Sequence, residues 1–329
     1  MPLTDLPLAE LQQYRSAVPE PADFDGFWDD TLRTSRELAF EPVVTRVDAG
    51  LTAVEVHDVT FSGYDGEPIK AWLHRPVGAA ESAPVVVRYV GYNCGRGLPH
   101  MVHPLALAGH AVLTVDNRGQ GSVAGYASDT SDIGGLRRAY CGHVTRGLES
   151  RETYYYRRLY TDAVLAVDAA RLLPGVDPDR VAVAGVSQGG GIALAVAGLA
   201  DGIGAALIDV PFLSDVPRGV DLSATIPYNE LATLLASYPG SREAAFGVLE
   251  YFDGVHFAAR ATAPALFSVG LMDDICPPST VYAAYNAYAG EKELQVYHHG
   301  GHEGGGFAHE ALQLDRLPAL LAAAGAARS

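Results

Sequence analysis

Residues 181–191 read VAVAGVSQGGG, and this stretch decides how the chain folds. The apolar residues 181–184 predict a buried strand, and the small and apolar residues that follow the stretch predict a helix. Between them Gly185 to Gly189 place Ser187 on the turn. The two outer glycines remove side chains where strand and helix crowd together, so the serine hydroxyl is held exposed on a strained turn. Because strand and helix flank it, we interpret the motif as a nucleophile elbow and not as a turn that merely uses small residues.

Outward from this stretch, strands alternate with helices along the chain. The clearest helix runs from Tyr160 to Leu173, where Pro174 and Gly175 end it and lead back to the central strand. Nearly continuous apolar runs, typical of strands covered on both faces, occur at 85–90, 111–115, 181–184, 205–210, 265–269 and 294–297. This alternation predicts a doubly wound α/β sheet.

The segment before the first of these runs has a different pattern. Apolar residues alternate over 54–61 and 69–75, and Gly63, Asp65 and Gly66 lie between the two segments, as in an antiparallel hairpin. With the elbow, these patterns predict the α/β-hydrolase fold. We expect a mostly parallel central sheet with helices on both faces and antiparallel N-terminal edge strands.

One domain over residues 1–329 is expected, because the chain shows no linker. Its spaced aromatics mark residues 1–40 as an N-terminal helical appendage. Residues 212–262 interrupt the alternation, which predicts a helical insertion over the site; a crossover that grew longer explains the segment equally well.

Composition limits the partners and the compartment. With 23 Lys and Arg against 39 Asp and Glu, the formal net charge is −16, so we expect neither nucleic acid nor an anionic membrane as a partner. Cys94, Cys141 and Cys276 form no C-x-x-C pair and are interpreted as reduced thiols. The start of the chain lacks the pattern of a signal peptide and no long apolar run follows, so a cytoplasmic protein is expected.

A serine hydroxyl needs a neighbouring base, and in this fold the base comes late in the chain. His302 lies in a glycine-rich loop past the last strand, whereas His298 and His299 lie nearer that strand and are expected to be packing or surface residues. The same cluster, together with Glu303, suits zinc by ligand type. The spacing is not that of a helical metal motif, so we favour His302 as the general base and expect no metal.

The acid and the oxyanion donors follow from position in the fold. Asp273 and Asp274 both follow the strand at 265–269; spacing favours Asp273 as the residue that orients the histidine, and Asp274 lies nearer to the next helix as a cap. The backbone N–H groups of Gln188 and Tyr92 are the expected oxyanion donors. The ring of Tyr92 either bounds a small acyl pocket or closes the end of the sheet.

Three ordered motifs resemble those of the acetyl xylan esterase and cephalosporin C deacetylase family, carbohydrate esterase family 7. They are Arg118-Gly119-Gln120-Gly121, Gly185 to Gly189 and His302-Glu303. The resemblance extends to 19–24, 154–157 and 270–273 and so covers nearly the whole chain. Departures from the family pattern are Cys94, where glycine is usual, and Asp274 and His256, where asparagine is usual.

The resemblance implies a triad of Ser187, Asp273 and His302, with an oxyanion hole formed by Tyr92 and Gln188. It also implies the removal of acetyl groups from small acetylated sugars and from cephalosporins, in a ring-shaped homo-hexamer. The mechanism would pass through an acetyl-serine intermediate and require no cofactor.

Two other hypotheses about the function remain at this point. One is a carboxylesterase or peptidase of the same fold that accepts larger acyl groups, and the other is a catalytically silent binding scaffold.

Overall fold

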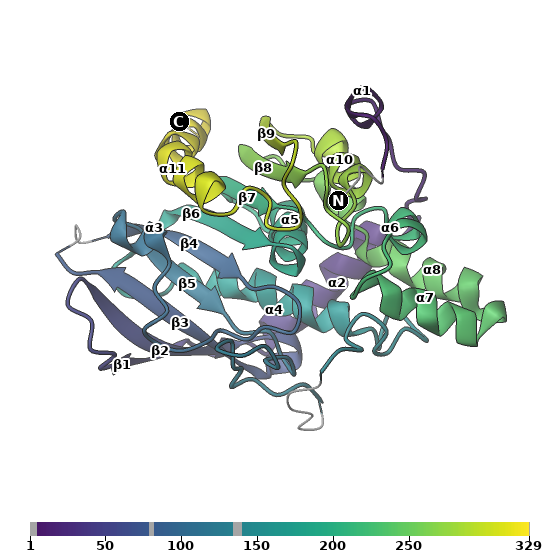
Figure 1. Cartoon of the computed structure of the whole chain (residues 1–329). Helices are drawn as coiled ribbons and strands as arrows, with labels where there is room; N and C mark the ends of the chain where they lie inside the picture. The colour runs from purple at the N-terminus through teal and green to yellow at the C-terminus, as the bar shows by residue number, and fades with distance from the viewer. Residues whose placement is uncertain (1–4, 79–81, 134–139, 329) are drawn as a thin grey trace.

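The computed structural model of the chain describes residues 5–78, 82–133 and 140–328, with side chains to residue 323; the first four residues of the expected appendage lie outside these ranges. The described strands form a single sheet in the order β1-β2-β3-β5-β4-β6-β7-β8-β9 (Figure 1). Its strands are β1 Val43–Val47, β2 Val54–Ser62, β3 Pro68–Pro76, β4 Ala83–Tyr89, β5 Ala111–Val115, β6 Val176–Val186, β7 Ala205–Asp209, β8 Ala265–Gly270 and β9 Lys292–Tyr297.

The direction of the strands divides the sheet into two parts. The ladders β1–β2, β2–β3 and β3–β5 are antiparallel, and every ladder from β5 to β9 is parallel. The α/β-hydrolase fold expected from the sequence is confirmed, and all six predicted parallel strands and the β2–β3 hairpin occur. Strand β1 was not predicted, because its residues are mostly exposed and carry no alternation of apolar and polar types.

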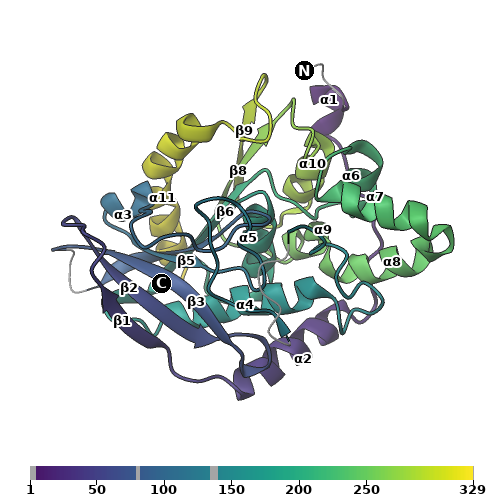
Figure 2. The ribbon, with the colours of Figure 1, turned by 60° about the horizontal axis from the view of Figure 1, so that its bottom comes forward.

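Helices cover both faces of the sheet. The described helices are α1 Leu8–Leu11, α2 Phe24–Glu37, α3 Pro104–Leu107, α4 Tyr155–Ala170, α5 Gln188–Leu199, α6 Val216–Leu222, α7 Tyr228–Ser237, α8 Arg242–Leu249, α9 Gly254–Ala258, α10 Pro278–Ala287 and α11 Gly306–Arg328. In β4, Val85 and Val87 pack in the core with α2, α4 and α5, and Val86 packs with α3 and α11. Figure 2 shows α2 and α4 together on one side and α11 on the other. Burial on both faces is why these strands are valine-rich.

The crossover helix differs from its prediction. We expected Tyr160 to Leu173, and α4 begins five residues earlier, at Tyr155, and ends at Ala170. Nearly all of its side chains are buried, including Tyr155, Tyr156 and the charged Arg158, so its first turn does not show the one-sided apolar pattern that marks a helix by periodicity. The end is set by the turn before Pro174, which cannot continue the helix.

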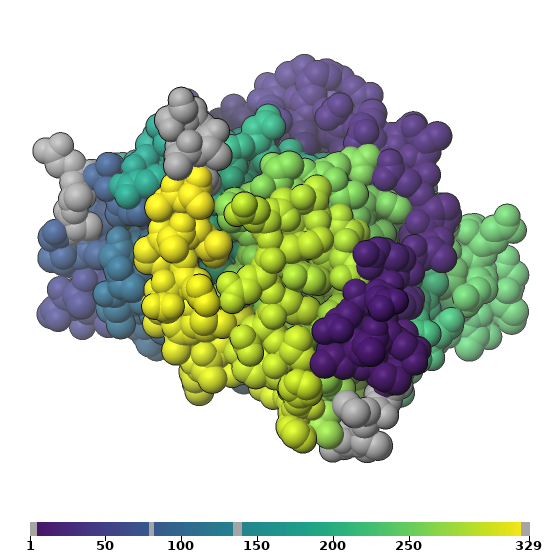
Figure 3. Space-filling model, turned by 90° about the horizontal axis from the view of Figure 1, so that it is seen from above, coloured from purple at the N-terminus to yellow at the C-terminus, as the bar shows by residue number. Residues whose placement is uncertain are grey.

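The N-terminal segment packs on the C-terminal half of the chain. Figure 3 shows it lying against the surface formed by residues near α10. Asn286 in α10 donates to the carbonyls of Leu11, at 3.2 Å, and Tyr14, at 2.8 Å. Asp5 accepts a hydrogen bond of 2.7 Å from the backbone N–H of Ser279. Among the described residues, no helix has both the length and the apolar character that crossing a bilayer requires.

Candidate active site

The nucleophile elbow forms where the sequence predicts it. β6 ends at Val186 and α5 begins at Gln188, so Ser187 is the only residue between strand and helix. Its backbone adopts φ 60° and ψ −121°, a conformation that side-chain-bearing residues rarely take. The turn is held by hydrogen bonds on both sides: the Ser187 N–H donates 2.9 Å to the carbonyl of Asp209, and its carbonyl accepts from Phe212 N at 3.0 Å.

Two glycines make the elbow sterically possible. A Cβ atom at Gly185 would collide with the backbone carbonyl of Gly189, and one at Gly189 would collide with the carbonyl of Tyr89. Backbone atoms cannot move aside as a flexible side chain can, so any larger residue would open the turn. The spacing of the motif therefore reflects close contact among β4, β6 and α5.

The structure brings Ser187, His302 and Asp273 together, although 115 residues separate the serine from the histidine. His302 Nε2 lies 2.8 Å from Ser187 Oγ, and its Nδ1 lies 2.9 Å from Asp273 Oδ2. The serine is partly exposed and the aspartate is fully buried. This is the geometry in which an imidazole accepts a proton from a hydroxyl while a carboxylate holds its other nitrogen.

The two neighbouring aspartates differ in what they contact. Asp273 uses Oδ2 for His302 and Oδ1 for the backbone N–H groups of Ile275 and Cys276, both at 2.9 Å. Asp274 is exposed. The capping interpretation offered for Asp274 is therefore wrong. Asp273 accepts hydrogen bonds from the amides before α10 with one carboxylate oxygen and contacts His302 with the other.

The loop that carries His302 is shaped by glycine. Gly304 and Gly305 have φ +56° and +90°, and a Cβ atom at Gly305 would collide with the ring of Tyr297. Glu303 turns back and accepts a 2.9 Å hydrogen bond from Gly301 N. The loop is thus tied both to itself and to the end of β9.

The other late histidines lie outside this arrangement. His298 and His299 are exposed at the end of β9, as expected for surface residues. Within the described ranges, no group of three or more His, Cys, Asp or Glu side chains is placed as metal ligands are. The carboxylate of Glu303 is engaged with its own loop.

The two expected oxyanion donors have free N–H groups. Gln188 is the first residue of α5, so its N–H has no partner in a preceding turn. In the described part of the chain, neither this N–H nor that of Tyr92 donates to a backbone carbonyl. Tyr92 follows β4, and Gln188 follows β6, and these strands are neighbours in the sheet.

The direction of the Tyr92 N–H is fixed by hydrogen bonds to the Gly91 carbonyl, which belongs to the same peptide unit. The carbonyl of Gly91 accepts from Cys94 N at 3.1 Å, from Asn117 Nδ2 at 3.2 Å and from Gln188 Nε2 at 3.3 Å. The next amide is also held, since Asn93 N donates 2.6 Å to Gln120 Oε1. A trans peptide unit is planar, with its C=O and N–H opposed. Holding the Gly91 carbonyl therefore points the Tyr92 N–H the other way.

Sequence analysis did not single out Asn117 as part of the site. Its side chain contacts three carbonyls, those of Val90, Gly91 and Cys94, at 3.1–3.2 Å. The available signal was its position directly after the strand at 111–115 and before the Arg118-Gly119-Gln120-Gly121 motif. Periodicity says nothing about which loop such an amide will bind.

Gln188 contributes its side chain as well as its backbone. Its Oε1 accepts from Tyr156 Oη at 2.8 Å and from Gln120 Nε2 at 3.1 Å. Gln120 Nε2 also donates to Tyr155 Oη at 2.9 Å. These groups are buried, so each hydrogen bond replaces one that water would otherwise supply. The start of α5 is thereby locked to the start of α4.

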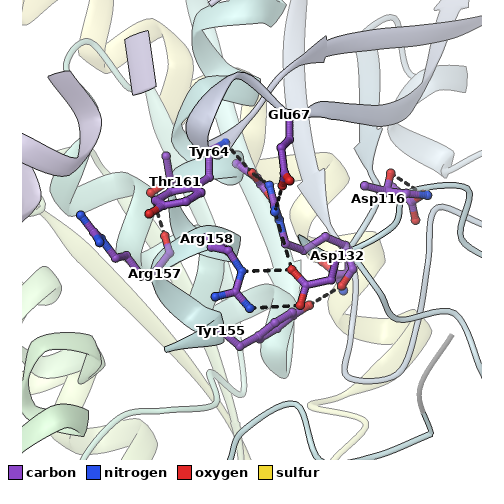
Figure 4. Close-up of polar contacts among 12 residues, drawn as sticks. Tyr64, Glu67, Asp116, Asp132, Tyr155, Arg157, Arg158 and Thr161 are labelled. Carbon is purple, nitrogen blue, oxygen red and sulfur yellow. Dashed lines mark hydrogen bonds and ion pairs between the residues drawn. The ribbon is translucent and has the colours of Figure 1, made fainter. Parts of the chain in front are cut away.

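A buried ionic network lies behind this layer. Arg118 is fully buried and donates to both oxygens of Asp162, at 2.6 and 2.7 Å. Figure 4 shows Glu67, Asp132 and Arg158 converging on the same region; Arg158 contacts both oxygens of Asp132 at 3.0 Å. Planar guanidinium groups suit such two-point contacts. The network joins the hairpin, the Arg118 motif and α4 without touching Ser187.

The side chain of Tyr92 is anchored to the 212–262 segment. Its Oη donates 2.8 Å to Glu230 Oε2 in α7 and accepts from the N–H groups of His143 and Val144, at 2.9 and 3.1 Å. Burial, and then the charge of Glu230, raise the pKa of Tyr92 well above its ordinary value, so the phenol keeps the proton that it donates. The ring lies edge-on to Phe212, 6.3 Å between centroids. The phenol thus joins the loop after β4, which contains Tyr92, to α7.

Cys276 was predicted only to be a reduced thiol, and it lies beside the nucleophile. Its side chain is buried and lies near enough to the Ser187 hydroxyl for that group to influence the thiol. Burial raises the pKa of this thiol far above its ordinary value, so the group stays uncharged. It fills space under the nucleophile as a small apolar group.

Comparison with known proteins gives one family. The family model described as Acetyl xylan esterase (AXE1) matches residues 1–316. A curated relative, acetyl esterase Axe7A of Xylanibacter ruminicola, is 29% identical over 284 residues, which are 84% of this chain. The chain spans 62% of the length of that relative.

Solved structures of the same description superpose along nearly their full length. An acetyl xylan esterase from Paenibacillus sp. R4 has 38% identity and a TM-score of 0.88, covering 95% of this chain and 99% of its own. Acetyl xylan esterase 1 from Thermoanaerobacterium sp. JW/SL YS485 has 33% identity and a TM-score of 0.86, covering 96% and 99%. An acylaminoacyl peptidase of Pyrococcus horikoshii, at 18% identity and a TM-score of 0.58, covers 83% of this chain and 41% of its own and shares the fold.

Proposed function

Because the chain belongs to the acetyl xylan esterase family, we propose that it is a serine esterase that removes acetyl groups from small substrates such as acetylated xylo-oligosaccharides and cephalosporin C. The observation that carries the proposal is the contact of Ser187 Oγ with His302 Nε2 at 2.8 Å, with Asp273 behind the histidine. In this proposal Ser187 is the nucleophile, His302 the general base and Asp273 the residue that holds the imidazole.

In the first half of the reaction, Ser187 Oγ attacks the acetyl carbonyl carbon and its proton passes to His302 Nε2. The N–H groups of Tyr92 and Gln188 stabilise the negative charge on the carbonyl oxygen. The C–O bond to the sugar then breaks, and His302 gives the proton to the departing alcohol oxygen. An acetyl group remains on Ser187.

In the second half, water attacks the acetyl-serine carbonyl as His302 takes one of its protons. The tetrahedral intermediate collapses, Ser187 recovers its proton from His302, and acetate leaves. Asp273 stays ionised throughout and stabilises the imidazolium that forms in each half. The cycle uses water as its only co-reactant and no cofactor.

We further propose that residues 212–262 act as an insertion that bounds the acyl side of the site. The supporting observation is the hydrogen bond from Tyr92 Oη to Glu230 in α7. Figure 1 shows α7 and α8 projecting as a pair beside α6, at the margin of the sheet. A bounded acyl side favours acetyl over longer acyl groups.

The assembly and location are also proposals. The single sheet running from β1 to β9 supports one domain for the whole chain. The family resemblance supports a homo-hexamer. Free thiols at Cys94, Cys141 and Cys276 support a reducing compartment such as the cytoplasm.

The test is hydrolysis of 4-nitrophenyl acetate and 4-nitrophenyl octanoate by the wild-type protein and Ser187→Ala, with acetate release from acetylated xylo-oligosaccharides measured alongside. We expect acetate-selective activity that falls by about 10⁴- to 10⁶-fold in the variant. Preference for octanoate would favour an esterase for larger acyl groups. An inactive wild-type protein, or an active Ser187→Ala variant, would refute the proposal.

A further inference from the structure

One pocket is lined by chain neighbours of Ser187 and His302, contains none of the proposed catalytic residues in its lining, and has no part in the mechanism above. Its volume is about 250 Å³, and its wall includes Val186, Glu303 and Gly304. Val186 precedes Ser187 in the chain, and Glu303 follows His302. The pocket also contacts the first turns of α11 and the end of β4. It is therefore built around the loop that carries the general base.

Arg88 supplies an unsatisfied charge in this pocket. The residue is partly buried at the end of β4, and within the described ranges its guanidinium takes part in no hydrogen bond or ion pair. Burial lowers the pKa of Arg88, and Tyr126 and Glu310 offset this only in part. A guanidinium has five N–H donors, and a half-buried one without partners is suited to bind a ligand oxygen.

The remaining wall offers both donors and acceptors. His103 Nδ1 accepts the N–H of Leu105 at 3.3 Å, which leaves Nε2 as a donor, 3.6 Å from Glu310 Oε1. Glu303, Glu310 and Asp209 supply carboxylates to the pocket, and that of Asp209 already accepts a 2.7 Å hydrogen bond from Gln313 Nε2. With three carboxylates for one guanidinium, an anionic ligand would be repelled, whereas hydroxyl groups can both donate and accept.

An aromatic ring stands at the edge of the same pocket. Phe307, in the first turn of α11, is 90% exposed, the most exposed large apolar side chain among the described residues. A solvent-facing aromatic ring beside charged hydrogen-bonding groups is suited to a ligand that is apolar on one face and polar at its edge. A sugar ring has both: C–H groups on its face and hydroxyls around it.

The direction of the chemistry places the alcohol part of the substrate here. His302 must give its proton to the departing alcohol oxygen, so this part of the ester lies against the His302 loop, and the acetyl group lies toward Tyr92 and Gln188. Glu303, Gly304 and Phe307 continue that loop into α11.

We propose that this pocket is the subsite for the sugar ring that carries the acetyl ester, with Phe307 as its stacking platform and Arg88 as its hydroxyl ligand. The inference rests on the proposed esterase function and adds the pocket and the side chains that would hold the sugar ring. A volume of about 250 Å³, below the 300–1,000 Å³ of pockets for drug-sized ligands, suits one ring.

The experiment compares kcat/KM for acetylated xylobiose and for 4-nitrophenyl acetate in Phe307→Ala and Arg88→Gln. For the sugar ester we expect kcat/KM to fall roughly 3- to 10-fold for Phe307→Ala and about 10- to 100-fold for Arg88→Gln, mainly through KM. For 4-nitrophenyl acetate, kcat/KM should stay within about twofold, because this ester has no sugar ring. Arg88→Lys should recover part of the loss. Tyr238→Ala, which removes another exposed ring, is the matched control.

The outcomes separate this proposal from the proposed function. A wild-type protein inactive on both esters refutes the function itself. Normal wild-type activity on both, with unchanged sugar-ester kinetics in both variants, refutes the subsite alone. An equal loss on both esters shows that Arg88 has a structural role. A change in sedimentation coefficient for Phe307→Ala shows that the ring covers an interface between copies of the chain. Either of these last results overturns the subsite.

Discussion

The two sides of Ser187 differ in how their polar groups are paired. Toward Tyr92 and Gln188, buried amide side chains are hydrogen-bonded to backbone carbonyls. Toward Phe307, the guanidinium of Arg88 has no partner among the described residues. On the first side, the buried side chain of Asn117 donates hydrogen bonds to the carbonyls of the loop after β4. The second is lined by residues of α11 and by the loop of His302.

The difference matches two different tasks. An oxyanion hole stabilises charge only if its donors are already in place when the charge develops, so its supports must be rigid and paired. A site for a bound alcohol group gains affinity from groups whose hydrogen bonds the ligand completes. We call the side with Tyr92, Gln188 and Asn117 the paired side and the side with Arg88, His103 and Phe307 the open side. Substitutions on the paired side should therefore change kcat or stability, and those on the open side should change KM for sugar esters.

The largest effect is expected at Asp273, whose two oxygens are both engaged. Asp273→Asn should lower kcat for 4-nitrophenyl acetate by about 10⁴-fold, because an amide can present its NH₂ group to His302 and favour the wrong tautomer. The exposed neighbour gives the control, and Asp274→Asn should change kcat by less than about twofold. Equal effects of the two substitutions would contradict the assignment.

A smaller loss is expected when the Gly91 carbonyl loses one of its three hydrogen-bond donors. Asn117→Ala removes one of its two side-chain donors and should lower kcat roughly 10- to 100-fold with little change in KM, less than the ~10²–10³-fold lost when an oxyanion donor is deleted. Asn286→Ala, which also removes an amide that bonds two carbonyls, should leave kcat unchanged. If Asn117→Ala altered only KM, the carbonyl would not be what holds the Tyr92 N–H.

The phenol of Tyr92 should matter more for stability than for the reaction. Tyr92→Phe leaves Glu230 and two backbone N–H groups without their partner, and should lower the free energy of unfolding in urea by about 1–3 kcal/mol. Tyr288→Phe, which loses a single hydrogen bond to Ala263, should lower it by about 0.5–1.5 kcal/mol. A smaller loss of unfolding free energy for Tyr92→Phe than for Tyr288→Phe would show that the hydrogen bonds of the Tyr92 phenol do not stabilise the fold.

The smallest effect concerns His103 on the open side. Burial, and then the charge of Arg88, lower its pKa from 6.5 to about 3. Between these values the unfolded chain binds a proton that the folded protein does not, so stability is complete above pH 6.5 and falls as the pH decreases, by at most about 1.4 kcal/mol per pH unit. His103→Asn keeps a helix-capping residue but does not titrate. Urea unfolding at pH 7.5 and 5.5 should show a smaller decrease for the variant; an identical decrease would mean that His103 is protonated in the fold.

Prediction from sequence succeeded where the local pattern has one physical cause. Strands buried on both faces must be continuously apolar, and the elbow must place glycines where backbones touch, so the six parallel strands and the turn at Ser187 were predicted correctly. It failed where burial is uniform or absent. The first turn of α4 is buried except at Arg157 and β1 is largely exposed, so neither has a period to detect.

The amino-acid sequence by itself determined the fold class and the strand-turn-helix unit that holds Ser187. These depend on contacts between residues near each other in the chain, which motif and periodicity report. Only the tertiary structure decided that Asp273 and not Asp274 meets His302, that Asn117 bonds the Gly91 carbonyl, and that Arg88, in the same pocket wall as Phe307, has no partner in the described part of the chain. Each of these depends on where side chains from separate strands and loops come to lie in space, and no local pattern in the chain carries that information.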